Sequence, residues 1–250
     1  MQSLVVQNLN KVFRGGLFEK DKSVLKNVSF KVEKGVTTGF VGVNGSGKTT
    51  SLKCILGFIH PTSGGIHFFN NQILSSEVKS KIGYMPERPY FYEFLKAEEF
   101  LKFHWDLGGG GPGFNEACDE VLSRVNLLAS KKTVLRKFSK GMLQRVGLAQ
   151  AIIKKPDFLI LDEPMSGLDP DGRFLIKKII KEERSRGTTI FFSSHLLHDM
   201  EELCRDIVVI DQGQIIYQGE LKKFLNFSEG ETLDLELAFQ RFRENQQVQK

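Results

Sequence analysis

Hydrophobic positions in the first third of the chain follow the two-residue period of β-strands. Leu4–Phe13 is one such segment, Val28–Val32 alternates strictly, and Val36–Val41 runs into a glycine-rich turn. After that turn the apolar positions take helical spacing, until the stretch 60–64 with its proline and glycine ends the pattern. The order predicts a strand, a loop and then a helix.

The pattern changes from about Glu87 to Lys155, where periodic segments become helical and the apolar runs of buried strands disappear. One predicted helix has Asn115 as its N-cap, and the glycine-rich run Gly108–Gly113 before it predicts a flexible connector. The simplest interpretation is a helical segment inserted into a strand-containing core.

Buried-strand signals return at Phe158–Leu161, Thr188–Phe192 and Ile207–Ile210. An apolar helical face that ends near Gly187 separates the first two. This alternation predicts a parallel sheet covered by helices. Asp211–Gln214 then predicts a hairpin turn.

These patterns predict three parts of the chain. Residues 1–86 and 156–226 form a core of strands and helices, in which an N-terminal β subdomain accompanies an α/β sheet. Residues 87–155 form a helical subdomain, and residues 227–250 form a polar C-terminal extension whose last residues we expect to be mobile.

Composition narrows the class of protein. The 250 residues are 40% hydrophobic and 26% charged, which fits one folded domain, and the net charge of +5 is spread along the chain, so we expect no nucleic-acid partner. The sequence contains no apolar run of about 18 residues, and Met1–Leu9 lacks the start of a secretory signal, so we expect a cytoplasmic protein. The three cysteines are far apart, without metal-ligand spacing.

A phosphate-binding motif lies between the predicted strand and helix. Residues Gly42–Thr49 match G-x-x-x-x-G-K-[ST] at every fixed position. Backbone N–H groups would surround phosphate oxygens, Lys48 would reach the β- and γ-phosphates, and Thr49 would offer its hydroxyl to Mg²⁺. The alternative is an ordinary glycine-rich turn. The expected nucleotide contacts are Gly42, Asn44, Gly45, Ser46, Gly47, Lys48, Thr49 and Thr50.

Two carboxylates follow the predicted strand Phe158–Leu161, and adjacent acidic groups at the end of a core strand need cations or polar partners. In a P-loop enzyme Asp162 would hold Mg²⁺ directly or through water, and Glu163 would act as general base toward the attacking water. The alternative is a solvated strand end with a turn at Pro164.

The segment Phe138–Arg145, just before the acidic strand, resembles the signature of the ATP-binding cassette (ABC) family. Ser166–Asp169 is similar to the D-loop of that family, and Ser193–His195 is similar to its switch-histidine segment. The resemblance spans nearly the whole chain. It implies an ATP-binding subunit with a P-loop NTPase core, an antiparallel β subdomain and an inserted helical subdomain.

The resemblance also implies residue roles. Phe13 would stack on adenine, although a core position in a strand is the alternative. Ser139, Gly141 and Asp169 would contact nucleotide held by the opposite protomer, and Ser139 also fits a helix N-cap. His195 would contact the γ-phosphate; a buried core histidine and a metal pair with His198 are the alternatives.

The sequence departs from the family pattern at two places, the signature and the hinge before the helical segment. Lys140 and Met142 replace the usual glycine and glutamine of the signature, which puts a donor role for residue 142 in doubt. Glu87 replaces the usual glutamine at the hinge before the helical segment. A glutamate there can still coordinate Mg²⁺ or water, whereas the alternative is a surface charge in a loop.

The function implied is ATP hydrolysis coupled to solute export, with two ATP molecules between the protomers of a homodimer or of a paired cassette. Separate integral membrane permease subunits would dock at the aromatic cluster Glu87–Phe94, which would hold the chain at the inner face of the cell membrane. The alternatives are a soluble ABC-type ATPase acting on ribosomes or DNA, and a binding module without turnover.

Overall fold

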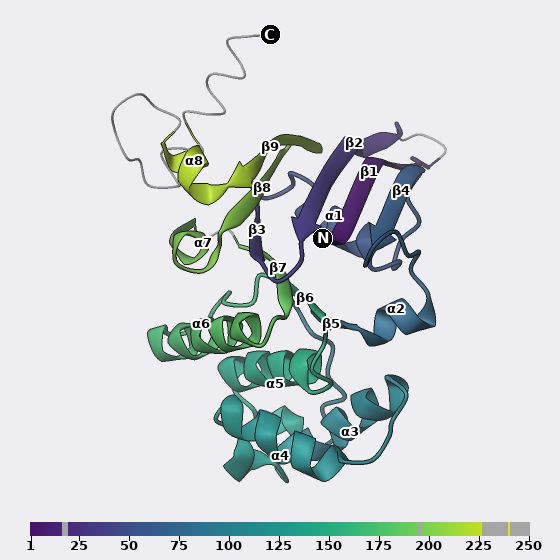
Figure 1. Ribbon diagram of the computed structural model, residues 1–250. Helices are drawn as coiled ribbons and strands as arrows, with labels where there is room; N and C mark the ends of the chain where they lie inside the picture. The colour runs from purple at the N-terminus through teal and green to yellow at the C-terminus, as the bar shows by residue number, and fades with distance from the viewer. Residues whose placement is uncertain (17–19, 195–196, 227–239, 241–250) are drawn as a thin grey trace.

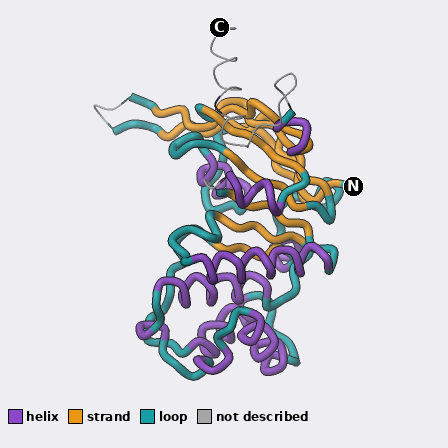
Figure 2. Tube along the Cα trace, turned by 90° about the vertical axis from the view of Figure 1, so that its left-hand side faces the viewer, coloured by secondary structure: helices purple, strands orange, loops and turns teal. Residues whose placement is uncertain are grey.

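The computed structural model describes residues 1–16, 20–194, 197–226 and 240. Two β-sheets occupy the upper part of the molecule, and a group of helices forms a lobe at the end opposite the N-terminal sheet (Figure 1). The view from the side shows the same separation of strands above and helices below (Figure 2).

The N-terminal sheet is antiparallel. It consists of β1 (Gln2–Phe13), β2 (Lys22–Glu33) and β4 (Ser63–Phe68), in the order β2-β1-β4. The strict alternation predicted for β2 is confirmed, because Val28 and Val32 are fully buried while the residues between them alternate in exposure.

The second sheet has six strands in the order β5-β6-β7-β3-β8-β9. Every neighbouring pair is parallel except β8 with β9, which form an antiparallel hairpin. The predicted parallel sheet and hairpin are therefore confirmed. The strands are β3 (Thr37–Val41), β5 (Ile82–Met85), β6 (Phe158–Asp162), β7 (Thr189–Ser193), β8 (Asp206–Asp211) and β9 (Gln214–Glu220).

Helices cover both faces of the six-stranded sheet, and residues 87–155 contain helices and no strand. The α-helices are α1 (Lys48–Ile55), α2 (Ser76–Ser80), α3 (Ala97–Leu107), α4 (Phe114–Arg124), α5 (Lys140–Ile152), α6 (Pro170–Ser185), α7 (Leu197–Leu203) and α8 (Leu221–Leu225). Short 3₁₀ turns lie at Leu128–Ser130 and Leu135–Lys137. In the part of the chain that is described, none of the helices has the length and apolar character needed to cross a bilayer.

Successive residues of the central strands point into two different cores. In β6, Phe158 and Ile160 pack with α1 and the N-terminal sheet, whereas Leu159 and Leu161 pack with helices of the lobe and with α6. Each strand of this sheet is therefore buried on both faces, which explains its continuous apolar sequence.

One predicted helix start is wrong. The N-cap of α4 is Gly113, with a φ of 82°, and the helix begins at Phe114, so Asn115 lies inside the first turn. A glycine in this left-handed conformation lets the chain turn directly from the connector into the helix, at a position that strongly disfavours other residues.

The domain boundaries at residues 86/87 and 155/156 stay a prediction. The polar extension predicted for residues 227–250 lies outside the described residues, apart from Gln240.

Candidate functional site

The phosphate-type loop connects β3 to α1, as the sequence predicts (Figure 1). Gly47 is the N-cap of α1 and has a φ of 112°, a left-handed conformation that favours glycine. Because Lys48 is the first residue of the helix, the loop backbone and the positive end of the helix dipole face the same space.

Lys48 is the cation of this loop, and only 7% of its surface is exposed. Its ammonium donates hydrogen bonds to Gly42 O at 2.6 Å and to Val43 O at 3.3 Å. Burial lowers the pKa of Lys48, while the charges of Glu163 and Asp162 act in the opposite direction. The cation and the two carboxylates therefore belong to one electrostatic site.

The acidic strand end is buried, with Asp162 at 2% exposure and Glu163 at 9%. Burial raises the pKa of Asp162, and the neighbouring charge of Glu163 raises it further. A hydrogen bond of 2.6 Å from Ser193 Oγ to Asp162 Oδ1 opposes both effects. The backbone N–H of Glu163 donates to the same hydroxyl at 3.0 Å, so Ser193 fixes both acidic residues.

A cleft of about 660 Å³ brings together sites predicted from separate parts of the sequence. Glu87, Glu163 and Ser166 line this cleft together with Phe13, which has 41% of its surface exposed. The Lys11 ammonium lies 5.0 Å from the centroid of the Phe13 ring. Phe13 is thus part of the cleft lining, and its alternative position in the core is wrong. The remaining lining residues are Lys22, Ser23, Val24, Lys26, Asn44, Gly45, Gly47, Lys48, Thr49, Thr50 and Gln212.

The oxygen groups at the cleft fit Mg²⁺ bound together with phosphate. Glu87 and Thr49 line the cleft, and the buried Asp162 directly precedes the lining residue Glu163; all three offer the oxygen ligands that this cation prefers. Within the described ranges, no three or more His, Cys, Asp or Glu side chains cluster closely enough to hold a metal by themselves. Mg²⁺ usually takes one or two carboxylates and completes its shell with phosphates and water, and the side chains of Glu87, Asp162 and Thr49 fit that preference.

The signature segment lies elsewhere. Ser139 is the N-cap of α5 and its hydroxyl accepts a hydrogen bond of 3.2 Å from Met142 N, and Asp169 caps α6 by accepting one of 2.9 Å from Gly172 N. Among the described residues that line the cleft, Ser139, Gly141 and Asp169 do not occur. One chain therefore does not bring its own signature to its phosphate loop.

Sequence reasoning gave no role to several residues that support the site. The turn of the β8–β9 hairpin lies against the loop, because Gly213 N donates to Ser46 O at 2.9 Å and Gly213 O accepts from Lys26 N at 2.8 Å. Gln144 of α5 is 5% exposed, and its side chain donates a hydrogen bond of 3.2 Å to the carbonyl of Pro164, the residue that follows the acidic pair. Only the strand pairing and the helix packing could have identified them.

His195 lies outside the described residues, and its predicted role stays a prediction.

A loop of this form between a strand and a helix of a largely parallel sheet, beside an acidic strand end, defines a P-loop NTPase. Comparison with known proteins narrows the class. Residues 25–166 match the model of the ABC transporter family. An uncharacterised ABC transporter ATP-binding protein of Synechocystis is 41% identical over 238 residues, which is 92% of this chain and 67% of the relative. The chain belongs to the family of ABC transporter ATP-binding proteins.

Two further relatives have names that refer to bacitracin and to linearmycin. The bacitracin transport ATP-binding protein BcrA of Bacillus licheniformis is 40% identical over 80% of this chain and 65% of its own length. The linearmycin resistance ATP-binding protein LnrL of Bacillus subtilis is 34% identical over 85% of this chain and 69% of its length. The chain thus spans about two thirds of these relatives.

Solved structures agree on the fold. One described as the ATP binding subunit of an ABC transporter has a TM-score of 0.85 and 28% identity, and covers 96% of this chain and 99% of its own. A dimeric ATP-binding cassette in a post-hydrolysis state, bound to ADP and Pi, has a TM-score of 0.78 and 23% identity, covering 87% of this chain and 98% of its own. These likenesses confirm the predicted α/β P-loop NTPase fold with its N-terminal antiparallel sheet.

Proposed function

We propose that this chain binds ATP with Mg²⁺ in the 660 Å³ cleft and hydrolyses it to drive transport through separate membrane subunits. The observation that carries the proposal is the convergence of Lys48, Glu163 and Glu87 on a single cleft beside the phosphate loop. A binding module without turnover would not require a buried acidic pair at this place.

The predicted site residues have separate roles in this mechanism. Phe13 stacks on the adenine ring, and the backbone of the loop with Lys48 binds the phosphates. Thr49, Asp162 and Glu87 would hold Mg²⁺, which would supply positive charge to offset that of the phosphates. Glu163 accepts a proton from the attacking water, with Ser193 fixing the backbone N–H of Glu163. The contact with the γ-phosphate that the sequence predicts for His195 would belong to the same mechanism.

The second protomer completes the site. Ser139 and Lys140 are exposed at the start of α5, where backbone N–H groups and the helix dipole favour an anion. Since these residues and Asp169 lie outside the cleft of their own chain, we place them against the ATP of a partner protomer, in a homodimer or a paired cassette. The dimeric state of a related cassette supports this arrangement.

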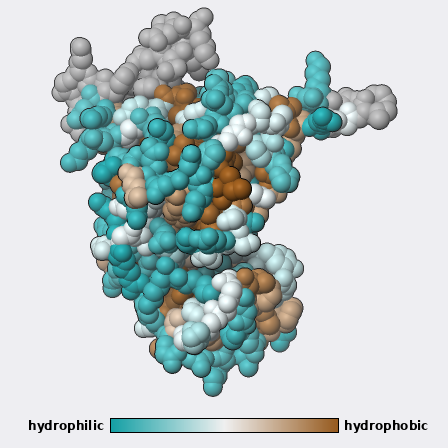
Figure 3. Space-filling view, turned by 45° about the vertical axis from the view of Figure 1, so that its right-hand side comes forward, coloured by the Kyte–Doolittle hydropathy of each residue, from teal (hydrophilic) through white to brown (hydrophobic). Residues whose placement is uncertain are grey.

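The membrane partner docks at the aromatic cluster Glu87–Phe94. Tyr90 is 82% exposed and Phe94 is 72% exposed, while Tyr92 packs edge to face against Phe103 of α3. Hydrophobic residues gather on one face of the molecule, both on the helical lobe and above it (Figure 3). Exposed aromatic groups are typical anchors of protein interfaces. The names of the bacitracin transport and linearmycin resistance relatives support export as the direction. We propose that this chain lies at the cytoplasmic face of the membrane, bound to its membrane subunits.

An ATPase assay of the purified chain, with and without a membrane fraction that contains the permease subunits, tests the function. We expect hydrolysis by the chain alone and a changed rate with membranes. A chain that responds to ribosomes or DNA and not to membranes would be a soluble ABC-type ATPase instead.

The double substitution Tyr90→Ala with Tyr92→Ala tests the docking surface. We expect it to weaken assembly with the membrane subunit by about 2 kcal/mol, the scale of interface hot spots, and to leave basal ATPase within about threefold. Pull-down of the membrane subunit beside an ATPase assay measures both. Phe174→Ala is the matched control, because Phe174 is 72% exposed on α6 and lies outside the cluster.

Full assembly of the double variant with the membrane subunit would show that the docking site lies elsewhere on the chain. Loss of basal ATPase would mean that the two tyrosines support the cleft and not the partner.

A further inference from the structure

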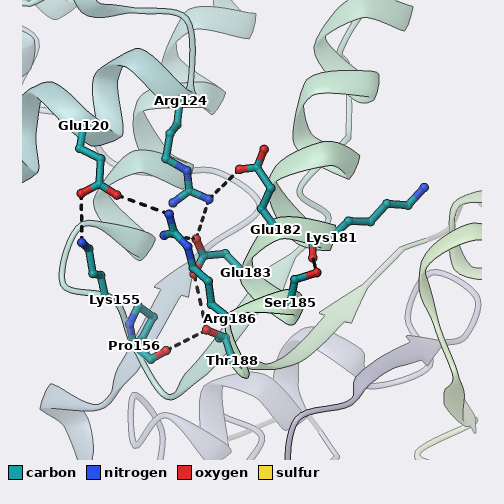
Figure 4. A network of polar contacts seen from close by, with 10 residues as sticks. All are labelled: Glu120, Arg124, Lys155, Pro156, Lys181, Glu182, Glu183, Ser185, Arg186 and Thr188. Carbon is teal, nitrogen blue, oxygen red and sulfur yellow. Dashed lines mark hydrogen bonds and ion pairs between the residues drawn. The ribbon is translucent and has the colours of Figure 1, made fainter.

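A network of charged residues joins the helical lobe to α6 (Figure 4). Arg124, the last residue of α4, points toward the C-terminal turns of α6, where Glu182 and Glu183 meet it. Lys155 and Arg186 complete the network around Glu120. It therefore connects segments that lie far apart in the sequence.

Glu183 is the buried centre of this network, with 1% of its surface exposed. It lies in the last turn of α6, where the helix dipole disfavours a negative charge, and burial disfavours that charge as well. Arg124 Nη2 lies 2.6 Å from Glu183 Oε1, and Arg186 Nη1 lies 3.2 Å from the same oxygen. The carboxylate thus depends on cations supplied by its neighbours.

Arg124 is the cation that crosses between the two parts. Its side chain is 14% exposed, and Nη2 also donates to Glu182 Oε2 at 3.1 Å. The pairs of Glu120 with Lys155 and with Arg186 have side-chain exposures between 41% and 64%, so solvent screens them and they contribute little. The ion pair between Arg124 and Glu183 is therefore the least solvent-screened contact of the network between the helical lobe and α6.

The two helices that this ion pair joins are each linked to a residue that we assign to the ATPase reaction, Ser139 before α5 and Asp169 before α6. Just beyond Arg124, the carbonyls of Val125 and Asn126 accept hydrogen bonds of 3.1 and 3.2 Å from Arg145 of α5, the helix that Ser139 caps. On the other side of the ion pair, Glu183 lies in the last turn of α6, and Asp169 caps the first turn of the same helix.

We propose that Arg124 is a positioning residue, whose ion pair with Glu183 fixes the orientation of α4 and α5 against α6. Ser139 and Asp169 are then presented together to the ATP of the partner protomer. An ion pair suits this role because it holds two side chains in a directional geometry, which an apolar contact does not. The inference rests on the proposed dimer with shared nucleotide sites.

The test uses the full chain with Glu163→Gln as the parent, in which ATP-dependent self-association is measured by light scattering. In Arg124→Met we expect association at least about tenfold weaker, because the buried carboxylate of Glu183 keeps Arg186 but loses its shorter ion pair, and α4 loses its contact with α6. Binding of ATP to the single protomer, measured by titration calorimetry, should stay within about twofold, since Arg124 lies outside the cleft. Arg124→Lys keeps one charge and should restore part of the association.

A double variant separates orientation from folding. Arg124→Met with Glu183→Leu removes both charges, and replacing a buried ion pair by apolar side chains commonly restores stability. We expect the thermal unfolding temperature to recover while association stays about tenfold weak. Lys155→Met is the matched control, because it removes an exposed pair of the same network, and it should behave like the parent.

Recovery of both stability and association in the double variant would overturn the proposal, since Arg124 would then serve only to neutralise Glu183. Association of Arg124→Met at the parent level would overturn it as well. If the parent itself does not associate with ATP, the proposed dimer fails, and the role of Arg124 falls with it.

Discussion

Glu163→Gln is expected to slow ATP hydrolysis by at least about a hundredfold while ATP binding persists. Glutamine has nearly the same size and shape as glutamate, but it cannot accept a proton from water near neutral pH. The backbone of Glu163 has a φ of 50°, and its N–H is held by Ser193 Oγ, so the side chain leaves a fixed point at the end of β6. The measurement is phosphate release at saturating ATP.

Glu116→Gln is the control for this substitution, because Glu116 is an exposed acidic residue in the first turn of α4. It should hydrolyse ATP at the parent rate. Hydrolysis by Glu163→Gln at the parent rate would show that a different group activates the water and that the acidic strand end has been misinterpreted.

Lys48→Ala is expected to reduce ATP affinity by about a hundredfold or more. The ammonium is the charge that opposes Asp162, Glu163 and Glu87 at the cleft. Without it, no cation of the phosphate loop itself offsets the three carboxylates beside the triphosphate. Titration calorimetry with ATP measures the change, and thermal unfolding verifies that the variant is folded.

Lys53→Ala provides the comparison for Lys48, since Lys53 is an exposed lysine of the same helix and should leave affinity unchanged. Equal ATP affinity in Lys48→Ala and the parent would show that the phosphate loop is not the binding site for ATP.

Local patterns predicted most of the fold. Strands β3 and β6 are buried on both faces, so their apolar sequences are continuous and easily recognised. β4 and β5 were not predicted. β4 begins with Ser63 and two glycines, and β5 has only four residues, so neither contains a clear alternation.

The candidate site was predictable where its chemistry is contiguous in the sequence. The loop Gly42–Thr49 and the pair Asp162–Glu163 each occupy one short segment. Ser193 supports the acidic pair only because β6 and β7 are parallel with Asp162 opposite Ser193, and this register is a property of the sheet. Gln212 reaches the cleft through the β8–β9 hairpin, and Arg124 meets Glu183 through helix packing, so neither contact follows from a local pattern.

Light scattering of Glu163→Gln with and without ATP tests the central claim most directly, because two protomers must share the nucleotide if Ser139 and Asp169 serve the partner. With ATP and Mg²⁺ we predict the mass of a dimer, and without ATP the mass of a monomer. Ser139→Arg in the same chain should prevent association, since a bulky cation replaces the small hydroxyl that caps α5. A mass that ATP does not change would contradict the account.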